Sequence, residues 1–245
     1  MPAFLVHGNP DSARLWPRTI ERLGDYDGEI VAADLPGFAE EAPAGFAKTK
    51  ESYVEWISAR LEELGGDVDL VGHDWGSLLV QRVASTRPDL VRSVACGGAA
   101  VDREYPWHPL AQVWQTPGEG ERYMEEELTD EFGIAHLIEN GVPREDAEAN
   151  VWTTPHGKGT ILDLYRSAVD IGDEWQPDLE RIEVPAMVIW GRTDPYVPLE
   201  FGAALAQRMN GELVVLECGH WWPFERPAET AEALLRHWAG ASGGA

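Results

Sequence analysis

Short apolar runs alternate with segments of helical spacing along most of the chain. The runs predict strands at residues 3–6, 29–33, 69–71, 91–96, 184–190 and 213–217. The helical patterns predict helices at residues 12–23, 51–64, 77–86, 199–209 and 227–238. Such alternation is typical of a mostly parallel sheet flanked by helices on both faces. The pattern therefore predicts an α/β fold.

The alternation of strand and helix patterns is interrupted between residues 101 and 180. This stretch is rich in Trp, Pro and Glu and has helical character, so it is predicted to be an insertion between two strands of the core. We expect it to form a helical cap after the strand that ends near Cys96. Residues 1–100 and 181–245 would then make up the core.

The balance of charges excludes several partners. The 245 residues contain 43 Asp and Glu against 19 Lys and Arg, which gives a formal net charge of −24. A surface this acidic repels nucleic acids and anionic membranes, so neither is an expected partner. No apolar run approaches the roughly 20 residues that cross a bilayer, and no secretory signal is recognised, so we expect a cytoplasmic location. Nothing in the sequence separates a monomer from a homodimer.

The sequence Gly72-His73-Asp74-Trp75-Gly76 stands between a predicted strand and a predicted helix. Its spacing matches a nucleophile elbow, in which small flanking residues allow a sharp turn that exposes the central side chain. The central residue is Asp, whose carboxylate attacks a saturated carbon and forms an ester with the substrate. An Asp that only caps the following helix is the less favoured alternative, because two glycines flank it.

Two further polar residues follow successive predicted strands. Asp194 lies after the strand that ends at Trp190, and His220 lies after the strand at residues 213–217. The order nucleophile, acid, histidine is that of a hydrolase triad, in which the acid orients the imidazole and the imidazole activates water. We therefore predict that Asp74, Asp194 and His220 are catalytic.

The loop after the first strand reads His7-Gly8-Asn9-Pro10. Folds of this kind place a second donor for developing negative charge in this loop. The side-chain amide of Asn9 and the indole of Trp75 are predicted to stabilise a leaving group or oxyanion, and two such donors suit a departing halide. We interpret His7 as a residue that orders its own loop.

Together these motifs resemble the α/β-hydrolase superfamily over nearly the whole chain, specifically its Asp-nucleophile branch of haloalkane dehalogenases and epoxide hydrolases. The segments His7-Gly8-Asn9-Pro10 and His73-Asp74-Trp75-Gly76 are similar to those of the dehalogenases. The resemblance implies that Asp74 is the nucleophile and that Asn9 and Trp75 hold the halide.

Other segments resemble the epoxide hydrolases. These are Cys218-Gly219-His220-Trp221 and Leu164-Tyr165-Arg166. In that family a cap tyrosine protonates or polarises the epoxide oxygen, and the resemblance implies this role for Tyr165. The family's second tyrosine aligns with Val113, so this chain lacks one of the two donors.

Comparison with two groups of enzymes in this branch narrows the choice of the acid and of the substrate. Dehalogenases that share this Asn commonly take their acid from a Glu after the strand before the cap, but this chain reads Cys96-Gly97-Gly98-Ala99 there, so the implied acid is Asp194. Fluoroacetate dehalogenases are similar in Trp107-His108, but Trp75 and Leu78 stand where they carry arginines for the substrate carboxylate. A small anionic haloacid is therefore not expected.

Aromatic residues are expected to line an apolar cavity between cap and core. We expect one or two of the tryptophans at 107, 114, 152 and 175 to do so, with Trp107 and Trp114 favoured, together with His108 and Tyr165. The histidines lack metal-ligand spacing and no Gly-rich phosphate loop occurs, so we expect no metal and no cofactor.

We therefore hypothesise a cofactor-independent hydrolase that cleaves carbon–halogen bonds of small, neutral, apolar substrates. The alternative is an epoxide hydrolase with the same triad, and a Tyr165 phenol that faces Asp74 across the pocket would favour it. A further alternative is a non-catalytic ligand-binding protein on a hydrolase scaffold. An esterase that uses Ser77 is the weaker possibility.

Overall fold

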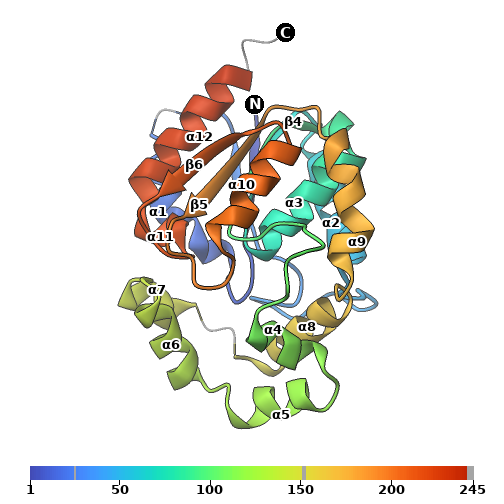
Figure 1. Ribbon diagram of the computed structural model, residues 1–245. Helices are drawn as coiled ribbons and strands as arrows, with labels where there is room; N and C mark the ends of the chain where they lie inside the picture. The colour runs from blue at the N-terminus through green and yellow to red at the C-terminus, as the bar shows by residue number, and fades with distance from the viewer. Residues whose placement is uncertain (25, 151–152, 242–245) are drawn as a thin grey trace.

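The computed structural model describes residues 1–24, 26–150 and 153–241, and its core is a six-stranded sheet (Figure 1). The strand order is β2-β1-β3-β4-β5-β6, and neighbouring strands pair in parallel. The strands are β1 (Ala3–Val6), β2 (Ile30–Ala33), β3 (Val68–His73), β4 (Val91–Gly97), β5 (Ala186–Gly191) and β6 (Glu212–Leu216). The predicted α/β fold is therefore confirmed.

Helices cover both faces of the sheet. In Figure 1, α1, α11 and α12 lie together on one side of the strands, and α2 and α3 lie on the other. The core helices are α1 (Pro17–Ile20), α2 (Lys50–Glu63), α3 (Trp75–Thr86), α10 (Leu199–Arg208), α11 (Trp222–Glu225) and α12 (Pro227–Ala241), with short 3-10 turns η1 (Ala13–Leu15) and η2 (Pro88–Leu90).

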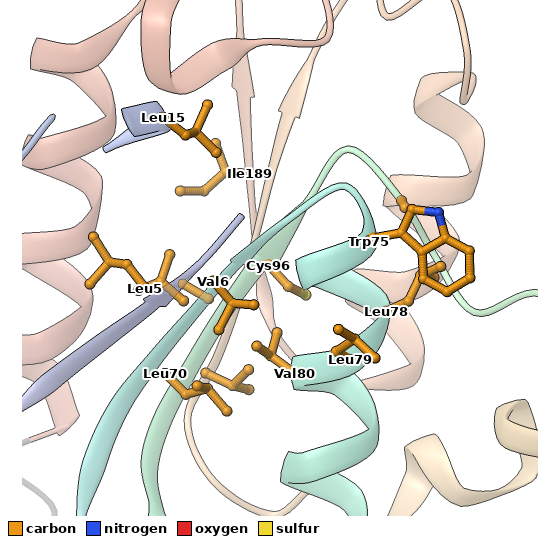
Figure 2. Close-up of a cluster of buried hydrophobic side chains, with 14 of the residues drawn as sticks. Leu5, Val6, Leu15, Leu70, Trp75, Leu78, Leu79, Val80, Cys96 and Ile189 are labelled. Carbon is orange, nitrogen blue, oxygen red and sulfur yellow. The ribbon is translucent and has the colours of Figure 1, made fainter. Parts of the chain in front are cut away.

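Three of the four inner strands are buried along their whole length. Every residue of β1, β3 and β5 is buried, because helices cover both faces of a parallel sheet. Figure 2 shows Val6, Leu70, Val80 and Cys96 gathered where α3 meets the strands, whereas the Trp75 indole points away from that layer. The first turn of α3 therefore directs a large, buried side chain away from the sheet.

The helix predicted at residues 12–23 is wrong as a continuous element. The chain instead forms η1, followed by α1. Ser12 caps the N-terminus of η1 through a hydrogen bond from the Arg14 backbone N–H at 3.3 Å. Pro17 then occupies the first turn of α1, since proline has no N–H group to continue the preceding turn.

The segment between β4 and β5, residues 101–180, is called the cap segment here. Its described residues up to 166 lie beyond the carboxyl ends of the strands, whereas residues 171–180 lie beside α3 of the core (Figure 1). The cap segment holds α4 (Pro109–Gln115), α5 (Glu119–Glu126), α6 (Asp130–Glu139), α7 (Arg144–Ala149), α8 (Pro155–Arg166), α9 (Ile171–Trp175) and most of the 3-10 helix η3 (Gln176–Arg181).

None of the helices in the described ranges is both long and apolar enough to cross a bilayer.

Asn150, at the end of α7, fastens the cap segment to the loop after β1. Its side-chain amide donates to Asp11 Oδ1 at 3.0 Å and to the Pro10 carbonyl oxygen at 3.4 Å. Its amide oxygen accepts from the Ser12 hydroxyl at 3.1 Å. Because Asn150 is buried, losing it would leave these polar groups without a partner.

We predict that Asn150→Ala lowers the free energy of unfolding by about 1–3 kcal/mol, because buried groups left unsatisfied carry their full desolvation cost. Urea denaturation measures the change. Asn140→Ala is the matched control, since Asn140 also ends a helix but makes one local bond, to the His136 carbonyl oxygen at 2.8 Å. The control should cost less than about 1 kcal/mol. If both variants lost the same free energy of unfolding, the role of Asn150 in holding the cap segment to the core would be contradicted.

Candidate active site

The turn between β3 and α3 consists of Asp74. Its backbone has φ 52° and ψ −119°, a conformation that residues with a side chain rarely adopt. The two glycines of the motif permit it, since a Cβ at Gly76 would lie 2.3 Å from the Val6 carbonyl oxygen. A Cβ at Gly72 would lie 2.3 Å from the Gly76 carbonyl oxygen. The elbow spacing therefore reflects close packing of α3 against the sheet.

Both oxygens of the Asp74 carboxyl group have neighbours. The Asn9 backbone N–H donates to Oδ1 at 2.7 Å, and Nε2 of His220 lies 3.7 Å from Oδ2. Burial raises the pKa of Asp74 to about 6, while the charge of His220 and the N–H groups of Asn9 and Trp75 limit the rise. At neutral pH the group is therefore ionised, with one oxygen bound and the other facing the imidazole.

Asp194 fixes the orientation of the His220 ring. Its Oδ2 accepts a hydrogen bond from His220 Nδ1 at 2.8 Å, and its Oδ1 accepts from the backbone N–H groups of Tyr196 and Val197 at 2.8 and 3.0 Å. With Nδ1 directed at Asp194, Nε2 is the atom that faces Asp74. The structure thus brings together the three residues predicted to be catalytic.

The charge of His220 depends on these two carboxylates. Burial alone would lower the pKa of His220. The charge and hydrogen bond of Asp194, followed by the charges of Asp74 and Asp11, outweigh burial and raise the pKa to about 9. The resting site therefore holds an imidazolium between carboxylates.

A second buried histidine supports the His220 loop. Nε2 of His73 bonds to the His220 carbonyl oxygen at 2.9 Å. Burial holds the pKa of His73 well below its usual value, so the ring is neutral. The residue before His220 is fixed by Glu225, whose carboxylate accepts from the Gly219 N–H at 3.0 Å. Neither contact was predicted from the sequence. For His73, its place in the elbow motif was the available signal of a role near the site.

The predicted leaving-group donors surround the hydroxyl of Tyr165. The Asn9 amide Nδ2 lies 3.5 Å from the Tyr165 hydroxyl oxygen, and the rings of Trp75 and Tyr165 meet edge to face with centroids 5.0 Å apart. Nε1 of Trp75 is buried and forms no hydrogen bond of good geometry within the described ranges. It nevertheless lies near enough to influence the phenol.

Tyr165 reaches this position from the end of α8 and is buried. Burial, followed by the charge of Asp74, raises the pKa of Tyr165 well above its usual value, and the side chains of Asn9 and Trp75 oppose the rise. The phenol is therefore protonated at neutral pH. It also lies within electrostatic reach of Asp74.

A pocket of about 210 Å³ opens beside Asp74, between the core and the cap segment. The four residues predicted for the substrate pocket, Trp107, His108, Trp114 and Tyr165, all line it. Sequence reasoning missed several other lining residues, most of which lie on separate elements outside the motifs described above. These include Leu78, Tyr105, Tyr123, Phe132, His136, Tyr196 and Trp221.

The other two tryptophans considered for the pocket are Trp175 and Trp152, and Trp175 does not line it. Trp175 is buried elsewhere, with the cationic groups of Lys50 and Arg82 at 5.8 and 5.3 Å from its ring centre. Trp152 lies outside the described residues. Trp175 therefore has a packing role, which is the commoner one for a buried aromatic residue.

Asp11 is a buried carboxyl group that sequence reasoning missed. Its Oδ2 accepts from the Trp221 indole N–H at 3.1 Å, and its Oδ1 accepts from Asn150. Burial, followed by the charge of Asp74, raises the pKa of Asp11 to about 7. An available signal was its place two residues after Asn9, in the loop that carries a predicted donor.

Two residues considered for chemistry have structural roles. Nε2 of His7 accepts from the Leu35 N–H at 3.0 Å, and Nδ1 bonds to the Gly8 carbonyl oxygen at 2.7 Å, so His7 orders its loop as interpreted. The Ser77 hydroxyl donates to the Ala99 carbonyl oxygen at 2.6 Å and is fully buried. That bond leaves Ser77 unsuited to act as an esterase nucleophile.

Comparison with known proteins agrees with the fold. Residues 3–233 match the alpha/beta hydrolase family. The chain belongs to that family. Its members share the fold but differ in the bond they cleave, so the family alone gives a hydrolase and leaves the reaction to the site.

Relatives of this alpha/beta hydrolase carry names from several reactions. The (E)-2-((N-methylformamido)methylene)succinate hydrolase of Acinetobacter baylyi is 26% identical over 88% of this chain and 81% of its own length. Epoxide hydrolase A of Mycobacterium tuberculosis is 26% identical over 97% of this chain and 90% of its own length. A haloalkane dehalogenase of Bradyrhizobium diazoefficiens is 35% identical over 62% of this chain and 54% of its own length.

We predict that Asp74→Asn lowers the pKa of His220 in this hydrolase. The charge of Asp74 helps to raise that pKa to about 9, and an amide cannot stabilise the imidazolium in the same way. A histidine NMR titration measures the shift. Asp146→Asn is the control, because it removes a carboxylate that is paired with Arg18 instead. Equal shifts in both variants would contradict the electrostatic explanation.

Proposed function

We propose that the protein hydrolyses epoxides of small, neutral, largely apolar compounds through an ester formed on Asp74. The observation that carries the proposal is the protonated phenol of Tyr165, which lies beside the Asn9 amide and within electrostatic reach of Asp74. A departing halide is stable as an anion and needs no proton. An opened epoxide leaves an alkoxide, which does, so the position of the phenol favours epoxide opening over dehalogenation.

In the first step Asp74 Oδ2 attacks an epoxide carbon. The bond between that carbon and the ring oxygen breaks, and the oxygen takes the Tyr165 proton, which gives a hydroxyalkyl ester and a phenolate. Oδ1 is the oxygen bound by the Asn9 N–H, so it becomes the ester carbonyl oxygen. The attacking oxygen is therefore the one that faces His220.

Ester formation prepares His220 to act as a base. The ester removes the charge of Asp74, which is one of the charges that raise the pKa of His220. His220 then loses its proton, which passes through solvent to the Tyr165 phenolate. The neutral His220 accepts a proton from water through Nε2, and the hydroxide attacks Cγ of Asp74. The Asn9 N–H stabilises the resulting oxyanion on Oδ1. The bond between Cγ and the ester oxygen then breaks, and the departing alkoxide takes the proton from His220 to give the diol. The proton of the regenerated Asp74 carboxyl group returns to His220, which restores the resting site.

The lining of the pocket supports a neutral, apolar substrate. Aromatic rings dominate it, among them Trp75 and Trp107, which stack with centroids 5.8 Å apart. The net charge of −24 disfavours an anionic substrate. An aromatic pocket also favours substrates that carry an apolar or aryl group next to the reactive carbon.

Haloalkane dehalogenation is the second candidate. It is favoured by the side-chain N–H groups of Asn9 and Trp75, which suit a halide, and by the dehalogenase relative described above. Both reactions use the same nucleophile and the same base. The group transferred to Asp74 therefore distinguishes them.

We predict that His220→Phe accumulates a covalent ester when it is mixed with a panel of epoxides and haloalkanes. Without the base, Asp74 still attacks but water is not activated. Intact mass spectrometry with peptide mapping should show a hydroxyalkyl group on Asp74. The double variant Asp74→Asn, His220→Phe is the control and should remain unmodified. An adduct from haloalkanes alone would favour dehalogenation, and a folded variant without any adduct would favour the binding-protein alternative.

We predict that kcat/KM for an epoxide falls about tenfold per pH unit below pH about 6, because protonation of Asp74 removes the nucleophile. The His220 charge lowers the pKa of Asp74. The acid limb for ester formation should therefore move to higher pH in His220→Phe. Single-turnover rates of ester formation, measured from about pH 5 to about pH 8, report both effects. An acid limb that stays at the same pH in both proteins would contradict the coupling.

A further inference from the structure

Asn9 divides its two N–H groups between two different partners. Its backbone N–H donates to Asp74 Oδ1 at 2.7 Å, whereas its side-chain amide approaches the Tyr165 hydroxyl at 3.5 Å. The amide is buried, and its own oxygen has no hydrogen-bond partner within the described part of the chain. The Asn9 side chain is thus directed at the phenol through its N–H group. A hydrogen bond to its amide oxygen does not explain this position.

Trp75 approaches the same phenol from the first turn of α3. The indole lies edge to face with the Tyr165 ring, and its Nε1 is buried with no well-formed hydrogen bond to any described residue. A buried N–H group without an acceptor is costly. The contact of the Asn9 amide with the same hydroxyl is long, at 3.5 Å, so both N–H groups would bind the oxygen more strongly once negative charge develops there.

The position of the phenol is set by contacts of α8 with the core. The backbone N–H of Lys50 donates to the Ser167 hydroxyl at 2.9 Å, and the Lys50 ammonium donates to the Ser167 carbonyl oxygen at 2.6 Å, at the end of α8. Near the start of α8, a Cβ at Gly37 would lie 2.4 Å from Oγ1 of Thr160. Tyr165 therefore sits on a helix that packs directly on the core, so its hydroxyl is held near both donors.

A tyrosine that gives up its proton inside a protein becomes a buried anion. Burial penalises this anion, and the charge of Asp74 opposes it until the ester forms. N–H groups that point at the phenol oxygen stabilise the phenolate more than the phenol, so they act mainly in the transition state. Asn9 and Trp75 provide such groups.

We propose that Asn9 and Trp75 are positioning residues that stabilise the phenolate of Tyr165 during epoxide opening, and that they do not hold the departing oxygen themselves. This inference rests on the epoxide hydrolase function proposed above. In the step concerned, the Tyr165 O–H bond breaks, its proton goes to the ring oxygen of the epoxide, and the electron pair stays on the phenolate. The two N–H groups then bind that oxygen.

A double-mutant cycle tests whether Asn9 acts through Tyr165. Asn9→Leu, which keeps the side-chain size but removes the amide, is combined with Tyr165→Phe in the His220→Phe protein. Single-turnover ester formation from an epoxide is measured by intact mass, at a pH well above the pKa of Asp74. Asn9→Leu should slow the step about 10- to 100-fold when Tyr165 is present, as expected for a hydrogen bond to a charged group. With Tyr165→Phe, the further loss should be less than about twofold.

Trp75→Phe gives the same test without touching the loop of Asn9. It keeps an aromatic ring and removes only the indole N–H, and its effect should likewise disappear with Tyr165→Phe. Circular dichroism and thermal unfolding show which variants are folded. A merely structural role would slow the reaction equally in both backgrounds.

The outcomes separate this inference from the proposed function. If the wild-type protein hydrolyses no epoxide and His220→Phe forms no hydroxyalkyl ester, the proposed function fails. If epoxides are hydrolysed but Asn9→Leu and Trp75→Phe cost the same with and without Tyr165, the two residues act directly on the leaving oxygen or on the fold. That second result would overturn the phenolate inference alone.

Discussion

The site depends on carboxylates that remain charged inside the protein beside one imidazole. A buried charge without compensation is too costly to persist, and here each oxygen has a defined neighbour. Backbone N–H groups bind Asp194 and one oxygen of Asp74, and His220 faces the other carboxylate oxygens. The strained backbone of Asp74 persists because close packing at Gly72 and Gly76 holds the turn in place. The same charges set the protonation state of His220, so nucleophile and base are linked electrostatically.

The core and the cap segment contribute different parts of the chemistry. Strand ends of the core carry Asp74, Asp194 and His220, whereas the phenol of Tyr165 comes from α8. An acid on a separate layer can meet the nucleophile only if the layers are fixed relative to each other. Two polar connections contribute to this, one through Asn150 at the loop after β1 and one from α2 to the end of α8.

Asp11 connects the Asn150 contact with the loop that carries His220. It is bonded to Asn150 of the cap segment and to the indole of Trp221, the residue directly after His220. Its charge contributes to raising the pKa of His220. The residue that holds the cap segment therefore also helps to raise the pKa of His220. The position of the cap segment and the protonation of the base are thus linked.

The sequence by itself determined the α/β alternation, the elbow at Asp74 and the chain order of the triad, because these follow from local periodicity, glycine spacing and positions after strands. It also contained the signal for the break at Pro17, a proline inside a helical pattern, but the apolar spacing that continues across this point predicted one helix. The neighbours of Asn9 and Tyr165 were beyond it, because these residues are 156 positions apart and their contact depends on how α8 packs. Sequence motifs suggested a donor pair for a leaving group and, separately, an acid. Only the tertiary structure brought the donors to the acid, because that encounter is decided by the packing of two layers and by no local pattern.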